Sequence, residues 1–312
     1  MRIIVTGGTG FIGRALVNEL IDNGHSVTVL SRNAVKARTL LRSSATCIDW
    51  TPRSEGIWSE VFQDAEAVIN LAGEPIAEGR WTEARKRLIR DSRVSATKAV
   101  VDALRRHATP PCVLVNASGI GYYGPSNGIS INETVGAGSG FLADLCVEWE
   151  REARRAEECG VRVVRLRFGM VLDRDGGALP RLMLPFRLFL GGPVMPGSQW
   201  VSWIHRRDVI GLIEWALENP KVSGAVNAVS LDPVPMRMFC RALGNALHRP
   251  SWLPVPEIAL RAGLGELGSV MTTGQRVLPL VAVQEGYNFQ YPELEPALRA
   301  ILRPHVQPSR AA

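Results

Sequence analysis

Cysteine is scarce in this chain and shows no pattern. The five cysteines, Cys47, Cys112, Cys146, Cys159 and Cys240, form no C-x-x-C pair and stand at no Cys/His metal spacing. An odd, scattered set argues against a disulfide framework, and the missing spacing argues against structural zinc. We therefore predict reduced thiols, a cytoplasmic protein and no metal site.

Long apolar runs are also missing. No uncharged stretch approaches the ~20 residues that span a bilayer, and the N-terminus has the pattern of a core strand, without the basic segment of a leader. We expect no membrane partner and no secretory leader. With 312 residues, 46% of them hydrophobic and 21% charged, the chain is long enough for one large α/β domain with a smaller part appended.

Lysine is rare as well. It stands only at 36, 86, 98 and 221, so arginine carries most of the net charge of +6. Clusters such as Arg85-Lys86-Arg87 fall in helical stretches, where a solvated helix face explains them. No nucleic-acid-binding module accompanies the charge, so nucleic acid is not a predicted partner. A basic surface still attracts anionic cofactors and substrates.

A glycine-rich turn, TGGTGFIG at 6–13, follows the apolar strand pattern at 2–5 and precedes a helical stretch. Gly8, Gly10 and Gly13 fit G-x-G-x-x-G, and Gly7, Gly10 and Gly13 fit the looser G-x-x-G-x-x-G. Such glycines permit a tight turn, close approach to a pyrophosphate and close helix–sheet packing, while the helix N-terminus favours phosphates. The strand–turn–helix context predicts a dinucleotide site, and an ordinary structural turn is the alternative.

The end of the second predicted strand, 26–30, indicates which dinucleotide. An NAD-preferring site carries Asp or Glu about 20 residues after the glycines to accept from the ribose hydroxyls. Here Ser31 and Arg32 occupy that place, and the next acid is Asp49. The planar guanidinium of arginine suits a 2′-phosphate. NADP(H) is therefore favoured over NAD(H), unless Arg32 is simply a solvated loop residue.

Strand and helix patterns alternate along the chain. Strands are expected at 2–6, 26–30, 45–49, 66–71, 112–117 and 161–167, and helices at 11–23, 81–106 and 140–158. This alternation predicts an α/β fold, a Rossmann doubly wound parallel sheet. We divide the chain into a nucleotide-binding domain at 1–230, with a substrate-loop insertion near 176–200, and a small α-rich C-terminal substrate or capping domain at 231–306. The tail at 307–312 is expected to be disordered.

Several longer motifs together resemble one family. They include NLAGEPI at 70–76, NASGIGYYG at 116–124, GFLADLCVEWEREA at 140–153, RFGMVL at 167–172, SQWVSWIHRRD at 198–208 and GYNFQYPEL at 286–294. With the glycine turn, they make the chain similar to an atypical extended short-chain dehydrogenase/reductase. More narrowly, it resembles the NAD(P)-dependent epimerase-like "epimerase family" proteins, which have a small C-terminal domain of their own. A shared fold does not transfer a reaction by itself.

The resemblance implies a set of cofactor contacts. Gly7 and Gly13 shape the turn, and Thr9, Gly10, Phe11 and Ile12 cradle the pyrophosphate, with Ser31 and Arg32 at the 2′-phosphate. The adenine is expected to meet Asp49 and Trp50. The ribose is expected to lie above Leu71, Ala72 and Gly73, while Glu74 accepts from a ribose or orders the loop. Arg93 is expected to reach a phosphate, and the nicotinamide amide is expected to meet Met170 and Val171. A surface salt bridge is an equal alternative for Arg93, and core packing is an alternative for Leu71 and Ala72.

The catalytic motif of the superfamily is absent. Its Tyr-x-x-x-Lys pair places a positive charge beside a tyrosine and so lowers the pKa of the phenol. In the resembling segment, Leu142 and Cys146 stand at those two positions. Ser118 matches the superfamily's Ser/Thr position, and Tyr123 follows it at the carboxyl end of the sheet. We name Ser118 and Tyr123 as catalytic candidates; local packing is the alternative for Tyr123, and packing is favoured for Cys146.

Substrate contacts are expected from the later loops. The candidates are Arg187, which suits an anionic group, together with Gln199, Trp200 and His205. By resemblance His205 is more often structural, and Asp208 is expected to cap the following helix. Gln275 and Arg276 are candidates for closing the pocket, or for an interdomain hydrogen bond.

Three functions remain open at this point. A reductase or an epimerase would use NADP(H) on a small carbonyl, hydroxyl or nucleotide-sugar substrate. Because an epimerase needs a strong base, the missing Tyr-x-x-x-Lys pair favours a reductase slightly. A non-catalytic protein that binds or senses NADP(H) is the alternative, and a monomer and a homodimer are both compatible with the sequence.

Overall fold

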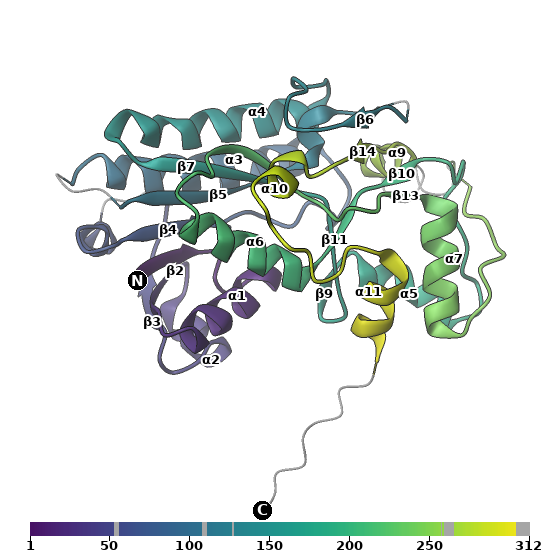
Figure 1. Cartoon of the computed structure of the whole chain (residues 1–312), viewed down its shortest axis with the longest axis horizontal. Helices are drawn as coiled ribbons and strands as arrows, with labels where there is room; N and C mark the ends of the chain where they lie inside the picture. The colour runs from purple at the N-terminus through teal and green to yellow at the C-terminus, as the bar shows by residue number, and fades with distance from the viewer. Residues whose placement is uncertain (53–55, 108–110, 127, 257, 259–264, 304–312) are drawn as a thin grey trace, which may run out of the picture.

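One seven-stranded parallel sheet forms the centre of the molecule (Figure 1). The computed structural model describes residues 1–312 except 53–55, 108–110, 127, 257, 259–264 and 304–312. The strands lie in the order β3-β2-β1-β4-β5-β7-β12. Their bounds are β1 Arg2–Thr6, β2 Ser26–Ser31, β3 Thr46–Asp49, β4 Ala67–Asn70, β5 Val113–Gly119, β7 Arg162–Phe168 and β12 Gly224–Ala228. This is the doubly wound order, so the predicted fold class is confirmed.

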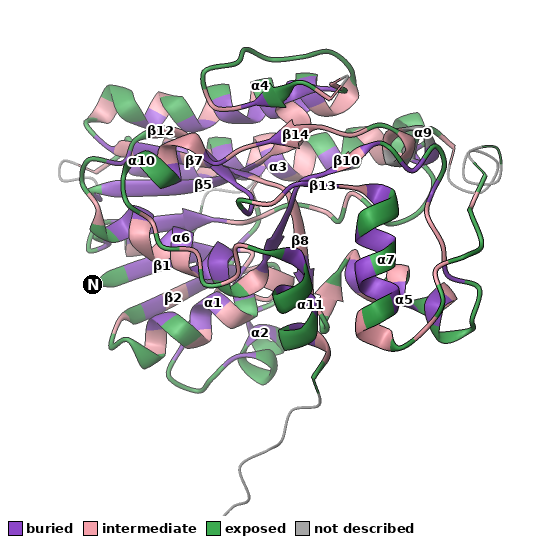
Figure 2. Cartoon of the chain, turned by 45° about the vertical axis from the view of Figure 1, so that its right-hand side comes forward, coloured by how far each residue is buried: buried purple, intermediate pink, exposed green. Residues whose placement is uncertain are grey.

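Helices cover both faces of the sheet because alternate strand residues point to opposite sides. Ile3 and Val5 of β1 enter one hydrophobic core, and Ile4 enters the other. The helices α1 and α6 pack together, as do α3 and α4, and Figure 2 shows the buried residues running along the strands between these layers. The helix bounds are α1 Phe11–Asp22, α2 Ala34–Leu40, α3 Glu83–Leu104, α4 Phe141–Arg154 and α6 Arg206–Glu218, with 3-10 turns η1 Ile57–Phe62, η2 Ile120–Tyr123 and η3 Arg155–Cys159.

A third hydrophobic core lies in a lobe beside the sheet, on the right of Figure 1. Phe186, Phe239 and Leu298 are buried in it, one from each of three helices. The elements of the lobe are β8 Met170–Asp173, β9 Gly176–Gly177, α5 Leu179–Arg187, β10 Trp200–Val201, β11 Trp203–His205, β13 Val234–Pro235, α7 Met236–Leu247 and α11 Leu294–Leu302. The segment 176–200, predicted to be a substrate-loop insertion, supplies α5 to this lobe.

Part of the C-terminal segment returns to the sheet. The strand β14, Arg276–Val277, pairs in parallel with β6, Ser130–Ile131, and the helix α10, Leu280–Gln284, contacts β12. The helix α9, Glu266–Thr272, precedes β14. The division at residue 230 stays a prediction, and the predicted tail at 307–312 lies outside the described residues.

Candidate functional site

The glycine turn is packed too tightly for side chains. Gly7 has a φ of +69°, and a Cβ there would lie 2.6 Å from the backbone carbonyl of Leu71. The Gly10 N–H donates to Gly7 O at 2.9 Å. A Cβ at Gly13 would lie 2.2 Å from Gly7 O and 2.7 Å from Gly8 Cα. These contacts hold the turn against the ends of β4 and α1, as a turn that approaches a pyrophosphate requires.

The first turn of α1 is open to an anion. Gly10 is the N-cap, no side chain caps the helix, and its first turn holds no acid. Gly10 is exposed, and Thr9, Phe11 and Ile12 are half-buried. Backbone N–H groups at such an end have no partner within the helix, and the helix dipole favours negative charge there.

Phe11 brings the glycine turn to the β8–β9 hairpin. A Cβ at Gly176 would lie 2.5 Å from the Phe11 ring, and one at Gly177 would lie 3.0 Å from that ring and 2.8 Å from Val171 O. Only glycine lets the ring sit this close. Phe11, predicted for the pyrophosphate, and Val171, predicted for the nicotinamide, therefore lie close together, with Met170 next to Val171 at the start of β8.

The ends of β2 and β4 meet at a charge cluster. The Arg32 side chain is 81% exposed, and its Nη1 lies 3.0 Å from Glu74 Oε1. Arg85 Nη1 lies 3.5 Å from Glu74 Oε2. The Ser31 hydroxyl contacts Asn33 at the limit of hydrogen bonding, 3.4 Å. The predicted 2′-phosphate residue Arg32 is thus accessible.

Two predicted adenine contacts have structural partners at the end of β3. Asp49 Oδ1 accepts from the Ala34 N–H at 2.7 Å, at the start of α2. Trp50 is buried and meets Trp58 edge to face at 6.0 Å. The structure places both near the Arg32 end of the sheet, since Asp49 pairs in register with Ser31.

The buried Arg93 side chain is bonded to the loop that follows β4. It is buried, donates to Ile89 O at 3.0 Å and to Glu74 O at 2.9 Å, and stacks over the Trp149 ring. Burial lowers the pKa of Arg93 to about 10. A Cβ at Gly73 would lie 3.0 Å from its Cζ, so the guanidinium lies against the backbone of the predicted ribose loop. Leu71 and Ala72, on the same loop, are half-buried and pack against the two cores.

A buried ion cluster lies behind Ser118. Its hydroxyl donates to Glu150 Oε1 at 2.8 Å. Arg167 donates to Glu150 from Nε at 2.7 Å and from Nη2 at 2.9 Å, and Arg165 adds a third bond at 3.1 Å. Ser118, Glu150 and Arg167 are each less than 5% exposed. A buried carboxylate needs such complete pairing, so the cluster fixes the end of β5 to α4 and β7.

Tyr123 belongs to the same cluster. Its phenol donates to Asn227 Oδ1 at 2.8 Å and accepts from Arg167 Nη1 at 2.9 Å. Burial raises the pKa of Tyr123, and the neighbouring Arg167 opposes that rise. The Arg167 guanidinium also lies 3.4 Å from the centre of the Tyr122 ring. The two catalytic candidates, Ser118 and Tyr123, are therefore linked through Glu150 and Arg167.

Two residues without charge, Leu142 and Cys146, occupy the positions of the superfamily's Tyr-x-x-x-Lys pair. Leu142 packs against Gly121, whose Cβ would lie 2.9 Å from Leu142 Cβ. Cys146 is buried with its thiol 3.6 Å from Gly119 O. Burial raises the pKa of Cys146 to about 11. The thiol is therefore not ionised at neutral pH, which agrees with the packing role.

The predicted substrate residues have different surroundings. Arg187 is exposed at the end of α5. Gln199 is buried, and its Nε2 donates to Val194 O at 3.0 Å. Trp200 is half-buried beneath Arg276, whose Cζ lies 4.6 Å from the ring centre. Gln275 Nε2 donates to Gly124 O at 2.8 Å, so the C-terminal segment reaches the loop that follows Tyr123.

His205 caps a helix. It is buried, its Nδ1 accepts from the Arg207 N–H at 3.0 Å, and its ring stacks on Tyr291 at 3.9 Å. The expectation that Asp208 caps α6 was wrong, because its carboxylate instead accepts from the N–H groups of Gln290 and Tyr291. Asp208 therefore holds the C-terminal segment against α6.

Sequence reasoning missed most of the buried polar groups. Asn70 donates to Thr97 and Asn116 and accepts from Thr6, all within buried surroundings below the loop at 71–74. Glu150 and Arg167 were not predicted as site residues either. One signal was available: Arg165 and Arg167 interrupt a strand pattern that is otherwise apolar, which is costly unless each charge is paired.

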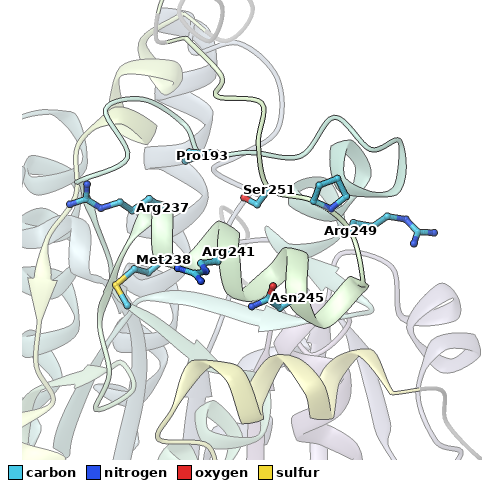
Figure 3. A pocket seen from close by; sticks show the side chains of 8 residues that line it. Pro193, Arg237, Met238, Arg241, Asn245, Arg249 and Ser251 are labelled. Carbon is cyan, nitrogen blue, oxygen red and sulfur yellow. The ribbon is translucent and has the colours of Figure 1, made fainter.

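A hollow of about 440 Å³ lies elsewhere, on the outer side of α7 (Figure 3). Its lining includes Arg237, Arg241, Asn245 and Arg249. Arg237 and Arg249 point away from each other at opposite ends. None of the predicted site residues lines this hollow, so its volume gives no support to a site there.

The part of the chain that the structure describes has neither a metal-binding cluster nor a membrane-spanning helix. No cluster of three or more His, Cys, Asp or Glu within this part of the chain is arranged to hold a metal ion. None of the helices that the structure describes has the length and apolarity needed to cross a membrane.

Comparisons with known proteins agree with this geometry. Residues 3–230 match the model of the NAD dependent epimerase/dehydratase family, and residues 255–301 match a domain of unknown function, DUF1731. The chloroplastic epimerase family protein SDR39U1 homolog of Arabidopsis thaliana is 42% identical, covering 97% of this chain and 87% of that protein. YfhF of Bacillus subtilis (strain 168) is 39% identical, over 97% of this chain and 98% of that protein.

A solved structure is also similar over nearly the whole chain. The human epimerase family protein SDR39U1 (isoform 2), crystallised with NADPH, has a TM-score of 0.85 and 34% sequence identity, covering 97% of this chain and 99% of that one. The predicted family is thereby confirmed. This chain belongs to the NAD dependent epimerase/dehydratase family, as an epimerase family protein with the additional C-terminal domain.

Proposed function

We propose that this protein binds NADP(H) and acts as a reductase or an epimerase-like enzyme on a small carbonyl, hydroxyl or nucleotide-sugar substrate. One observation carries the proposal. The helix α1 begins without a side-chain cap just after β1, and the accessible Arg32 follows the neighbouring strand β2 at the same edge of the sheet. The first feature suits a pyrophosphate and the second a 2′-phosphate. The similar human protein crystallised with NADPH supports the same coenzyme.

The residues present fit such a coenzyme. The missing Cβ atoms at Gly7 and Gly13 let the turn pack against Leu71 and close on itself, which gives the tight turn that such a site requires. In this proposal the pyrophosphate is surrounded by Thr9, Gly10, Phe11 and Ile12, and the 2′-phosphate meets Ser31 and Arg32. The adenine is bordered by Asp49 and Trp50. The ribose lies above Leu71 to Gly73, which Arg93 supports, and the nicotinamide meets Met170 and Val171.

NADPH, when bound, supplies the hydride. Tyr123 is our candidate for the proton: its phenol, whose pKa burial raises further, is protonated at neutral pH, and it would exchange its hydrogen bond to Asn227 for one to the substrate. Arg167 holds the phenol oxygen at 2.9 Å. A protonated phenol can donate but is a poor base, which favours reduction over epimerisation. Ser118 acts in this proposal as a positioning residue, since its hydroxyl is directed to Glu150.

Substrate would enter from the side of the later loops. Trp200 and Arg187 are the candidate contacts there, because both have exposed surface. Gln199 and His205 are buried and bonded to neighbouring backbone, so we propose that they support these loops from inside.

A second function has its own support. Leu142 and Cys146 occupy the positions of the superfamily's acid/base pair, and the raised pKa of Cys146 keeps its thiol neutral. A protein that binds or senses NADP(H) without turnover would show a complete nucleotide site beside such a pair.

Titration with NADPH and NADH, followed by nicotinamide fluorescence, tests the coenzyme. Tight NADPH binding that weakens selectively in Arg32→Ala is the expected result. Equal binding of both nucleotides, unchanged in the variant, removes the role of Arg32, and no binding of either refutes the proposed function. NADPH oxidation with a panel of carbonyl compounds then separates an enzyme, slowed in Tyr123→Phe, from a binding protein.

A further inference from the structure

One carboxylate is shared by two arginines at the predicted 2′-phosphate site. Glu74 Oε1 lies 3.0 Å from Arg32 Nη1, and Glu74 Oε2 lies 3.5 Å from Arg85 Nη1. The backbone of Glu74 is fixed on both sides: its N–H donates to Ser92 Oγ at 3.0 Å, and its carbonyl accepts from Arg93 at 2.9 Å. The carboxylate is therefore held next to Arg32 by α3.

The two arginines are held very differently. The Arg32 side chain is 81% exposed, whereas that of Arg85 is 18% exposed. Arg85 also donates from Nη2 to Pro75 O at 2.6 Å. An exposed ion pair contributes little and exchanges partners readily. Arg32 is thus free to leave Glu74, and Arg85 is not.

We propose that Glu74 and Arg85 set the preference for NADP(H) over NAD(H). Glu74 competes with the 2′-phosphate for Arg32, and Arg85 neutralises Glu74 once Arg32 has turned to the phosphate. Arg85 is a positioning residue and does not touch the nucleotide. The inference rests on the proposed function, since it requires that NADP(H) binds beside Arg32.

Charge balance explains why a second arginine is needed. A phosphate monoester carries close to two negative charges at neutral pH. A bare carboxylate beside it would repel it, and that repulsion is strongest where water is partly excluded. With Arg85 in place, the negative charge of Glu74 stays matched after Arg32 has left. NADH lacks the phosphate, so its binding does not depend on this balance.

A double-mutant cycle tests the inference by binding alone. NADPH and NADH are titrated at low ionic strength into the wild type, Arg85→Gln, Glu74→Gln and the double variant. Arg85→Gln is expected to weaken NADPH binding about threefold to fivefold, the range of a partly exposed pair, and to leave NADH within about twofold. The double variant is expected to bind NADPH as tightly as the wild type or tighter, because the carboxylate is gone too.

The matched control is Arg90→Gln, on the same helix. Arg90 pairs with Glu148 on α4, so its loss removes the same net charge without touching Glu74. NADPH affinity in Arg90→Gln should stay within about twofold of wild type, since distant surface charges are screened. Circular dichroism melting of each variant checks that the fold is unchanged.

Four results would overturn the inference. A double variant as weak as Arg85→Gln would mean that Arg85 contacts the phosphate directly. If Glu74→Gln weakened the binding of both NADPH and NADH, Glu74 would instead be accepting hydrogen bonds from ribose hydroxyls. A wild type that binds neither nucleotide refutes the proposed function and this inference with it, whereas tight NADPH binding with no coupling in the cycle refutes the inference alone.

Discussion

Arg167 donates a hydrogen bond from Nη1 to the phenol oxygen of Tyr123 at 2.9 Å. In the superfamily, the cation beside the tyrosine is a lysine on the same helix. Here the cation comes from β7, and the tyrosine comes from the turn after β5. The same pairing of a phenol with a positive charge is thus built from other elements, although burial outweighs the charge and the pKa of Tyr123 is raised.

Tyr123→Phe should lower the free energy of unfolding by about 1–2 kcal/mol. The change removes the hydrogen bonds that the phenol makes with Asn227 Oδ1 and Arg167 Nη1, and both of these buried atoms lose that partner. Chemical denaturation with urea measures the difference. Tyr122→Phe is the matched control: it keeps the ring beneath Arg167, and a change within about 0.5 kcal/mol is expected. Equal losses in the two variants would contradict a special role for the Tyr123 hydroxyl.

Glu150→Gln should be far more damaging, by about 3–5 kcal/mol, because it leaves Arg165 and Arg167 buried with uncompensated charge. Thermal unfolding followed by circular dichroism measures the loss. Glu148→Gln, two residues away, breaks a more exposed pair with Arg90 and should cost less than about 1 kcal/mol. A small effect at Glu150 would show that water reaches the cluster.

The sheet was largely predictable because buried parallel strands are continuous apolar runs. The strand β12 was missed, since Gly224-Ala225-Val226-Asn227-Ala228 contains a single large apolar residue. Its side chains matter nonetheless, because Asn227 is the acceptor for the Tyr123 phenol. A short edge strand with small residues carries too weak a pattern for sequence reasoning alone.

The glycine turn and the surroundings of Tyr123 also differed in how far the sequence predicted them. The glycine turn was predictable because its pattern is contained in neighbouring residues. Tyr123 was predicted as a catalytic candidate, but its link to Arg167 and Glu150 was missed, because these partners lie 44 and 17 residues apart and hydrophobic periodicity does not report such pairs. His205 shows the opposite case: a polar residue in a recognisable motif proved to be a buried helix cap.

Gly13→Ala should abolish nucleotide binding and destabilise the fold. The new methyl would lie 2.2 Å from Gly7 O and 2.7 Å from Gly8 Cα, so the turn must open, at a cost of about 1–3 kcal/mol. Fluorescence titration with NADPH and a urea melt measure the two effects. Gly136→Ala is the control, because its Cβ meets nothing within 4 Å, and both properties should stay at wild-type values.

The buried His205 should make the protein less stable as the pH falls below neutral. Burial, assisted by Arg207 and Arg206, lowers the pKa of His205 to about 4 from the ordinary value of 6.5. The unfolded chain therefore takes up a proton first. The stabilisation is complete above pH 6.5 and is lost between pH 6.5 and 4, by up to about 3 kcal/mol.

His205→Asn isolates this contribution. Asparagine keeps an N-cap oxygen for the Arg207 N–H but has no titrating ring. The variant should be less stable than wild type at pH 7.5, because it loses the stacking on Tyr291. The difference in unfolding free energy should shrink steadily from pH 6.5 to pH 4.5. A difference that stays constant over that range would mean that folding does not lower the pKa of His205, because the folded and unfolded chains would then bind this proton equally.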